Sequence, residues 1–146
     1  MLISYGLFCK EINNLKIAKN LLILSIKKYP SKINSYILLA EILRKENKVN
    51  DALKTLYAAK KIEKSNPDID YNLSISYKTI KSFREAILSI DSAIKLQPKN
   101  QIYQILKADI FIEFFKYEEA KELLLNLKLP KDLSLIHISE PTRPSI

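Results

Sequence analysis

Small residues recur every 34 positions along most of the chain, and this spacing constrains the fold more than any other feature of the sequence. Three series share the period: Gly6, Ala40, Ser74 and Ala108; then Ala18, Ala52, Ala86 and Ala120; then Ala59 and Ala93. A repeat of this length predicts an array of similar supersecondary units, each of which packs on the next.

Large apolar residues follow the same period beside the second alanine series. Leu15, Val49, Phe83 and Tyr117 stand three residues before its alanines, and Leu22, Leu56, Ile90 and Leu124 stand four residues after them. Residues three or four apart share one face of a helix, and small side chains at a helix crossing let two backbones approach closely. Each unit is therefore predicted to be a hairpin of two antiparallel helices, called helix A and helix B, of about 14 residues each.

Helix breakers lie where this arrangement requires them. Pro30, Pro67 and Pro98 are predicted to end one helix B or to begin the next helix A, and Asn13 and Asn47 tolerate a left-handed backbone between helices A and B. A single glycine in 146 residues disfavours a multi-stranded sheet. The sequence therefore predicts an all-α chain of about eight helices.

These units resemble the tetratricopeptide repeat (TPR) family, whose 34-residue unit carries small residues in both helices and an aromatic–acidic–acidic–alanine start to helix B. The best matches are FREAILSIDSAIKLQP, from Phe83 to Pro98, and YEEA, from Tyr117 to Ala120. The resemblance covers residues 1–132 as four units, about 1–32, 33–66, 67–100 and 101–132. It implies a right-handed α-solenoid of antiparallel helix hairpins. Leu127 departs from the second small position of the family.

The resemblance also implies that helices A line a concave wall that holds an extended peptide or a helix of a partner. The helix A residues predicted to face away from the packed small positions form a candidate peptide groove: Ile3, Leu7, Lys10, Asn34, Ile37, Glu41, Arg44, Asp68, Tyr71, Ile75, Lys78, Ile102, Ile105 and Asp109. Half of this set is apolar. The alternative for each isoleucine is that it packs between neighbouring helices A.

Some TPR proteins clamp the C-terminal carboxylate of a chaperone with lysines and asparagines of the groove. Here Leu38 occupies the place of one clamp asparagine, and Glu41, Asp68 and Asp109 would repel a carboxylate. The sequence instead predicts a non-catalytic scaffold for protein–protein interaction, which binds a peptide with apolar anchors and mixed charge.

The net charge of +8 raises the alternative of an RNA-contacting helical repeat. Most of the lysines fall on helices B or at their ends, whereas the candidate groove is nearly balanced in charge. Arg44 and Arg84 are the only arginines before the C-terminal tail. Arginine is the residue best suited to bidentate hydrogen bonds with phosphate groups or bases. We therefore expect a solvated lysine face and no specific nucleic-acid partner.

The sequence predicts no catalytic, cofactor-binding or metal-binding residues. It has no glycine-rich phosphate loop and no HExxH motif, and Cys9 is its only cysteine. A lone cysteine fits a reducing cytoplasm, and no apolar run approaches the roughly 20 residues that a membrane crossing needs. A further alternative is a targeting or regulatory segment of a larger enzyme, such as a glycosyltransferase, whose catalytic domain lies outside this sequence.

The last residues differ from the repeats. The segment LSLIHISEPTR, from Leu133 to Arg143, resembles the forward translation of a transposase adapter used in DNA sequencing, and it holds His137, the only histidine. We expect residues 133–146 to be a non-native or disordered tail. Helix B of the fourth unit carries more leucines than one hairpin covers, which predicts further repeats after Asp132. No residue indicates the oligomeric state.

Overall fold

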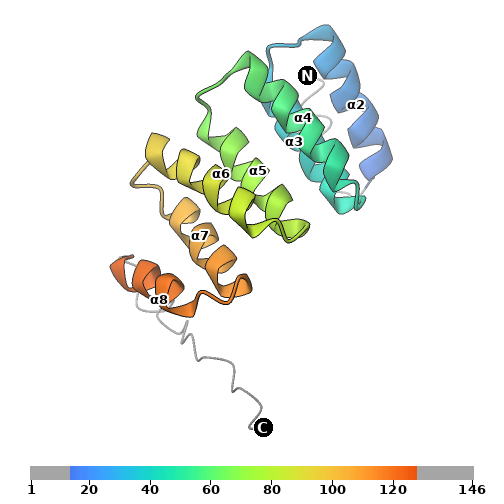
Figure 1. Cartoon of the computed structure of the whole chain (residues 1–146). Coiled ribbons are helices and arrows are strands. Elements are labelled where there is room, and N and C mark those ends of the chain that lie inside the picture. The colour runs from blue at the N-terminus through green and yellow to red at the C-terminus, as the bar shows by residue number, and fades with distance from the viewer. Residues whose placement is uncertain (1–13, 128–146) are drawn as a thin grey trace, which may run out of the picture.

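The computed structural model describes residues 14–127, which form seven α-helices in chain order (Figure 1). They are α2 (Leu15–Lys28), α3 (Ile33–Lys45), α4 (Val49–Ile62), α5 (Pro67–Thr79), α6 (Phe83–Leu96), α7 (Gln101–Glu113) and α8 (Tyr117–Asn126). The predicted all-α class is confirmed. The first predicted helix A and the tail from residue 133 lie outside the described residues.

The helices begin where the repeated residues predict. Each helix B, namely α2, α4, α6 and α8, begins at a large apolar residue of the periodic series: Leu15, Val49, Phe83 or Tyr117. Pro67 is the first residue of α5, where its missing N–H costs no helical hydrogen bond. The side chain of Asn66 accepts from the backbone N–H of Asp68 at 2.9 Å and caps the same helix.

The turn from helix A to helix B repeats as closely as the helices do. Asn47, Lys81 and Phe115 occupy the same position in successive units, and all have a left-handed backbone with φ of 61°, 62° and 61°. After each one, the next backbone N–H bonds to the carbonyl five residues earlier, for example Lys48 to Leu43 at 2.8 Å. The sequence predicted this conformation at Asn47. Lys81 and Phe115 adopt it because the same hairpin closure demands it.

The small residues hold helices A and B of one unit together. Those of the first two series that are described are buried, with at most 1% of their surface exposed: Ala18, Ala40, Ala52, Ser74, Ala86, Ala108 and Ala120. In the third unit the hydroxyl of Ser74 on α5 donates to the backbone carbonyl of Ala86 on α6 at 2.8 Å. Two helix backbones come this close only where no larger side chain separates them.

Neighbouring units join through apolar clusters that connect each helix B with the next helix A. Leu22 on α2 packs with Leu39 and Ile42 on α3; Leu56 on α4 packs with Ile69 and Leu73 on α5; Ile90 on α6 packs with Tyr103 and Ile110 on α7. Helix α3 also packs directly against α5. The hairpins therefore stack in chain order from α2 to α8, and helices A form one continuous wall (Figure 1).

The residue four positions before the small residue of helix A is Tyr36 in one unit and Asp70 in the next, and the two side chains make different contacts. Tyr36 donates its hydroxyl to the carbonyl of Pro30 at 3.0 Å. Asp70 has 1% of its side chain exposed, pairs with Lys60 of α4 and accepts from the hydroxyl of Ser92 of α6 at 2.8 Å. A buried carboxylate is stable only with such partners, so Asp70 connects three helices.

The register can be tested at Ala86. We expect Ala86→Leu to destabilise the fold by roughly 1–3 kcal/mol, because the larger side chain forces α5 and α6 apart. Lys95→Leu, at an exposed position of the same helix, should change the free energy of unfolding by less than about 0.5 kcal/mol. Urea denaturation measures both, and equal effects would mean that the helix faces are assigned wrongly.

A second stability test concerns the buried carboxylate. We expect Asp70→Ala to cost about 1–3 kcal/mol, since Lys60 and Ser92 lose their acceptor inside the array. The matched control is Asp91→Ala, whose side chain is 46% exposed and pairs with Lys107 at 2.7 Å. An exposed pair of this kind contributes about 0–1 kcal/mol. A loss at Asp91 as large as that at Asp70 would contradict the role given to Asp70.

Candidate functional site

The structure places the predicted groove residues on the three described helices A. Those within residues 14–127 lie on α3, α5 and α7 at recurring positions, and each keeps part of its surface exposed. Ile3, Leu7 and Lys10 lie outside the described residues. The wall is uneven in character, because its polar and apolar members make different contacts.

Arg44 joins α3 to α5. Its Nη1 donates to the Oγ of Ser76 at 3.2 Å and to the backbone carbonyl of Asn72 at 3.4 Å, and its Nη2 donates to the Oδ1 of Asn72 at 3.0 Å. Burial lowers the pKa of Arg44, while the nearby Glu41 and Tyr71 act in the opposite direction. The guanidinium is thus engaged by the next unit.

Lys78 repeats this contact one unit later and joins α5 to α7. Its Nζ donates to Asp109 and pairs with Glu113 at 2.8 Å. Burial acts to lower the pKa of Lys78, but the hydrogen bonds to Asp109 and Glu113 outweigh it and raise the pKa. Glu113 also accepts from Lys81 at 2.6 Å, and the hydrogen bonds from the two lysines hold the pKa of Glu113 below its ordinary value.

A tyrosine contact adds a second connection between α5 and α7. The hydroxyl of Tyr103 donates to the Oδ1 of Asp68 at 2.9 Å, and the Tyr71 and Tyr103 rings lie 5.4 Å apart at 36°. Burial, together with the hydrogen bond to Asp68, raises the pKa of Tyr103 to about 12. Asp68 therefore faces the groove with one oxygen already occupied.

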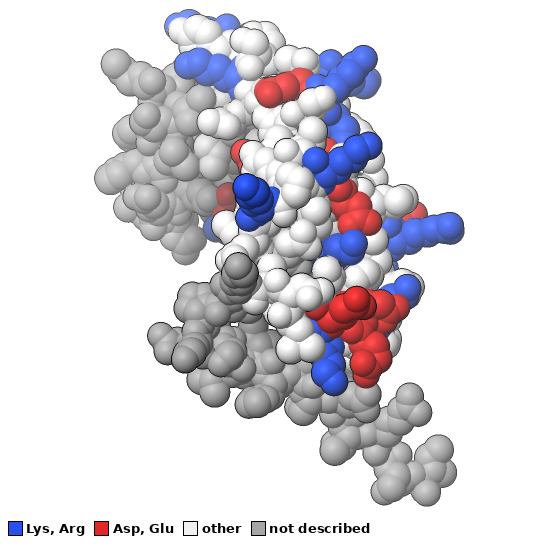
Figure 2. Space-filling view, turned by 90° about the vertical axis from the view of Figure 1, so that its left-hand side faces the viewer, with Lys and Arg blue, Asp and Glu red and all other residues white. Residues whose placement is uncertain are grey.

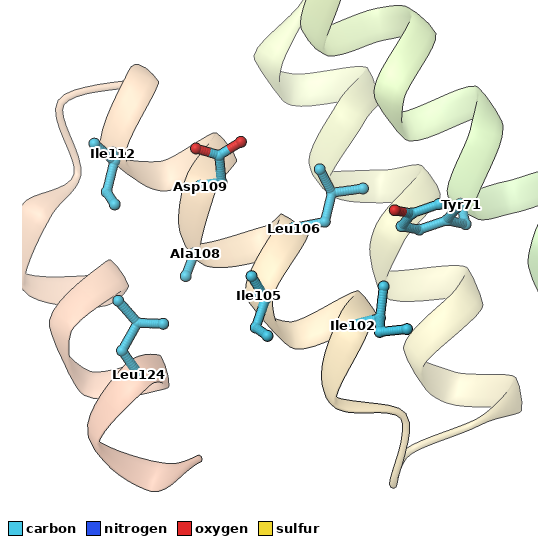
Figure 3. Close-up of a pocket in the computed structure, with 8 residues that line it drawn as sticks. All are labelled: Tyr71, Ile102, Ile105, Leu106, Ala108, Asp109, Ile112 and Leu124. Atoms are coloured by element: carbon cyan, nitrogen blue, oxygen red, sulfur yellow. The ribbon is translucent and has the colours of Figure 1, made fainter. Parts of the chain in front are cut away.

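An apolar pocket of about 370 Å³ lies beside these polar contacts (Figure 3). Side chains from α5, α7 and α8 line it, namely Tyr71, Ile102, Ile105, Leu106, Ala108, Asp109, Ile112 and Leu124. Ile102 is 59% exposed and Ile105 is 39% exposed. The pocket is large enough for one bulky apolar side chain or part of a helix, with the carboxylate of Asp109 at its edge.

The sequence identified part of this pocket. Tyr71, Ile102, Ile105 and Asp109 belong to the predicted groove. Leu106, Ala108, Ile112 and Leu124 were not predicted to line it. The repeat spacing, which places Ile112 in line with Arg44 and Lys78, was the signal for Ile112.

Acidic side chains lie among the lysines on the surface of helices B. Lys19 pairs with Glu46 at 2.7 Å, and Lys54 lies 3.7 Å from Asp51. On the face that Figure 2 shows, basic side chains are scattered along the array with acidic ones among them. Among residues 14–127, no group of His, Cys, Asp and Glu side chains could hold a metal ion. No helix in this range is long and apolar enough to cross a bilayer.

Solved structures show a similar arrangement of helices. A thermophilic TPR protein from Thermus thermophilus is similar with a TM-score of 0.81 and 16% sequence identity, covering 92% of this chain and 75% of that one. This chain has the TPR fold. MamA from Desulfovibrio magneticus is similar with a TM-score of 0.76 and 17% identity, over 94% of this chain and 76% of that one. No protein-family model and no curated protein sequence matches the chain.

The pKa of Glu113 gives a pH test of the contact between TPR helices α5 and α7. The pKa of Glu113 is lower in the folded state than in the unfolded state. Such a carboxyl stabilises the fold at pH values above its unfolded-state pKa, and this stabilisation is lost as the pH falls through its folded-state pKa. We expect Glu113→Gln to flatten the fall in unfolding free energy between about pH 5 and about pH 3. The unchanged chain, measured over the same pH range, gives the reference slope. An unchanged slope for Glu113→Gln, measured by urea denaturation at each pH, would contradict the contact.

Proposed function

We propose that this TPR chain is a non-catalytic scaffold for protein–protein interaction, which binds a peptide or a segment of a partner along the wall formed by α3, α5 and α7. The observation that carries the proposal is the apolar pocket between α5, α7 and α8, where Ile102 and Ile105 keep much of their surface exposed. An apolar concavity with a few polar groups at its edge is typical of a binding site.

The charges of the wall favour one kind of ligand. Arg44 and Lys78 donate to side chains of the neighbouring unit, so a ligand carboxylate would have to compete with these contacts. Asp109 lines the pocket and is paired with Lys78, and Asp68 lies on α5, is exposed and accepts from Tyr103 through one oxygen. A peptide with a bulky apolar anchor flanked by lysine or arginine therefore complements the wall better than an acidic C-terminus does.

The same contacts weigh against RNA as the main ligand. The paired lysines of the outer helices share their charge with Glu46, Asp51 and Asp70, and the wall itself carries acid near its apolar pocket. Phosphate binding requires cations that are available together on one surface. We therefore propose that the binding site lies on helices A and that its ligand is a protein segment rather than RNA.

A displayed peptide library panned on the immobilised chain tests this function. We expect selected peptides to carry a large apolar residue next to lysine or arginine. Tyr71→Ala and Ile102→Asp should each weaken their binding at least about tenfold, because each removes an apolar contact of the pocket.

The matched control is Leu88→Asp on helix B α6, where the side chain is 65% exposed away from the wall. Far-UV circular dichroism verifies that each variant keeps its helices. The proposed site would be refuted if Tyr71→Ala and Ile102→Asp bound the selected peptides as tightly as the unchanged chain does.

A further inference from the structure

The two edges of the array differ in how their lysines are paired. The turns from helix A to helix B line one edge, and the turns from helix B to the next helix A line the opposite edge (Figure 1). Lysines in the turns of the first edge have acidic partners: Lys48 pairs with Glu46 at 3.3 Å, and Lys81 pairs with Glu113 at 2.6 Å. The second edge, which faces the viewer in Figure 2, is different.

Seven lysines at the second edge form no ion pair with the described residues. They lie in or beside the three turns from helix B to helix A, and all are exposed: Lys27, Lys28, Lys32, Lys61, Lys64, Lys95 and Lys99. Lys60 differs, because its ammonium pairs with the buried Asp70. The acids nearest in sequence are Glu63, which is exposed, and Asp68, which accepts from Tyr103. The edge therefore carries an excess of positive charge that has no acceptor within the described residues.

Each of these three turns also places a large apolar residue between two lysines. The sequences are KYPSK at residues 28–32, KIEK at residues 61–64 and KLQPK at residues 95–99. The apolar side chains keep between 42% and 48% of their surface exposed: Tyr29, Ile62 and Leu96. We call these three residues and the seven lysines the basic edge. The same chemistry thus recurs three times along one side of the array.

Helix stability explains only half of this pattern. The first lysine of each turn lies in the last turn of helix B, where the helix dipole favours a cation. The second lysine stands just before the next helix A, where the dipole disfavours a cation. Lys32 is the N-cap of α3 and makes no side-chain cap hydrogen bond, and Lys99 directly precedes Asn100, which caps α7. These lysines therefore need another explanation.

Tyr29 brings two of the cations together. The ammonium groups of Lys28 and Lys32 lie 5.6 Å and 4.9 Å from the centroid of its ring. A tyrosine ring flanked by lysine is suited to the boundary between water and the hydrocarbon of a bilayer, where aromatic rings and long cationic side chains gather in membrane proteins. Ile62 and Leu96 supply aliphatic side chains at the equivalent places of the next two turns.

The repetition and the residue types favour a lipid surface. Three copies of one pattern in a row complement a partner whose chemistry is uniform along its surface. Lysine is a compact charge without the fork of arginine, and anionic headgroups attract lysines while exposed apolar side chains enter the acyl boundary. Ile62 and Leu96 cannot stack on bases as aromatic side chains do, which disfavours RNA at this edge.

We propose that the basic edge binds the surface of a membrane that contains anionic lipids, with its lysines at the headgroups and Tyr29, Ile62 and Leu96 at the boundary with the acyl chains. The sequence predicted these lysines to be a solvated face. The proposal rests on where the unpaired cations lie and not on the net charge. It uses a surface other than the proposed peptide wall, so it does not depend on the proposed function.

Sedimentation of the full chain with vesicles tests the proposal. The vesicles consist of phosphatidylcholine with about 30% phosphatidylglycerol, and vesicles of phosphatidylcholine alone are the reference. We expect binding to the anionic vesicles that is at least about tenfold tighter than binding to the neutral ones, because each lysine near an anionic surface contributes about fivefold. Equal binding to both kinds of vesicle, or binding to neither, would overturn the proposal.

Charge reversal in the turns locates the contact. One variant combines three substitutions on the basic edge: Lys32→Glu, Lys64→Glu and Lys99→Glu. We expect it to bind anionic vesicles at least about tenfold more weakly. Its stability in urea should not fall, because an acid before a helix N-terminus is favoured by the helix dipole. A loss of binding can therefore be distinguished from a loss of folding.

The matched control changes the net charge by the same amount at exposed cations that form no ion pair and lie on helices B outside the basic edge. It combines Lys16→Glu, Arg84→Glu and Lys121→Glu. This variant should lose much less binding than the one altered in the turns. Equal losses would mean that the vesicles respond to net charge alone, and the basic edge would then have no special role.

The apolar contact has a test of its own. Ile62→Ser combined with Leu96→Ser should weaken binding to anionic vesicles at least about fivefold, because both side chains lose their contact with the acyl boundary. Leu88→Ser is the control, since Leu88 is 65% exposed in the middle of α6. If the double variant binds as Leu88→Ser does, the apolar part of the proposal is wrong.

Two other anionic partners would give different results. Oligouridine represents RNA, and polyglutamate represents an acidic protein segment. Binding of either one through Lys32, Lys64 and Lys99, at about 150 mM salt and without binding to anionic vesicles, would overturn the assignment to a membrane. The peptides selected for the proposed wall should bind the variant altered in the turns as tightly as they bind the unchanged chain, which keeps the two proposals separate.

Discussion

The close crossing of helices A and B at small residues is the contact on which the remainder of the structure depends. The hydroxyl of Ser74 donates to the backbone carbonyl of Ala86, and the equivalent alanines of the other units have at most 1% of their surface exposed. Because the crossing recurs once in every unit, each helix A presents the same positions to the same side. One wall therefore holds Ile37, Tyr71 and Ile105, although a helix B separates each of them from the next along the chain.

The sequence predicted the fold well because the 34-residue period and the sizes of the repeated residues determine where each helix begins and where helices A and B cross. Large residues begin each helix B, small residues lie at each crossing, and Asn47 takes the left-handed turn as predicted. The partners of the polar groove residues were not predicted. Arg44 donates to Asn72 and Ser76, which lie in another unit. Only the packing of α3 on α5 brings these side chains together. Similarly, nothing in the residue type of Phe115 favours the left-handed turn it adopts.

Charge in this molecule serves mainly to connect units. Lys60 reaches the buried Asp70, Lys78 reaches Asp109 and Glu113, and Lys19 pairs with Glu46. Each of these contacts crosses from one helix to another. The net charge of +8 is therefore a poor guide to the partner, because many cations already have protein acceptors and the excess is spread along the array (Figure 2). The pocket between α5, α7 and α8 is the more informative surface, because it gathers apolar side chains from three helices in one concavity.

A single repeat position shows how the contact between successive helices A changes along the array. Arg44 and Lys78 sit at that position and form directional hydrogen bonds, which fix the register of the next helix A. Ile112 holds the same position on α7 and has no donor, so it cannot form the directional contact that joins α3 to α5 and α5 to α7.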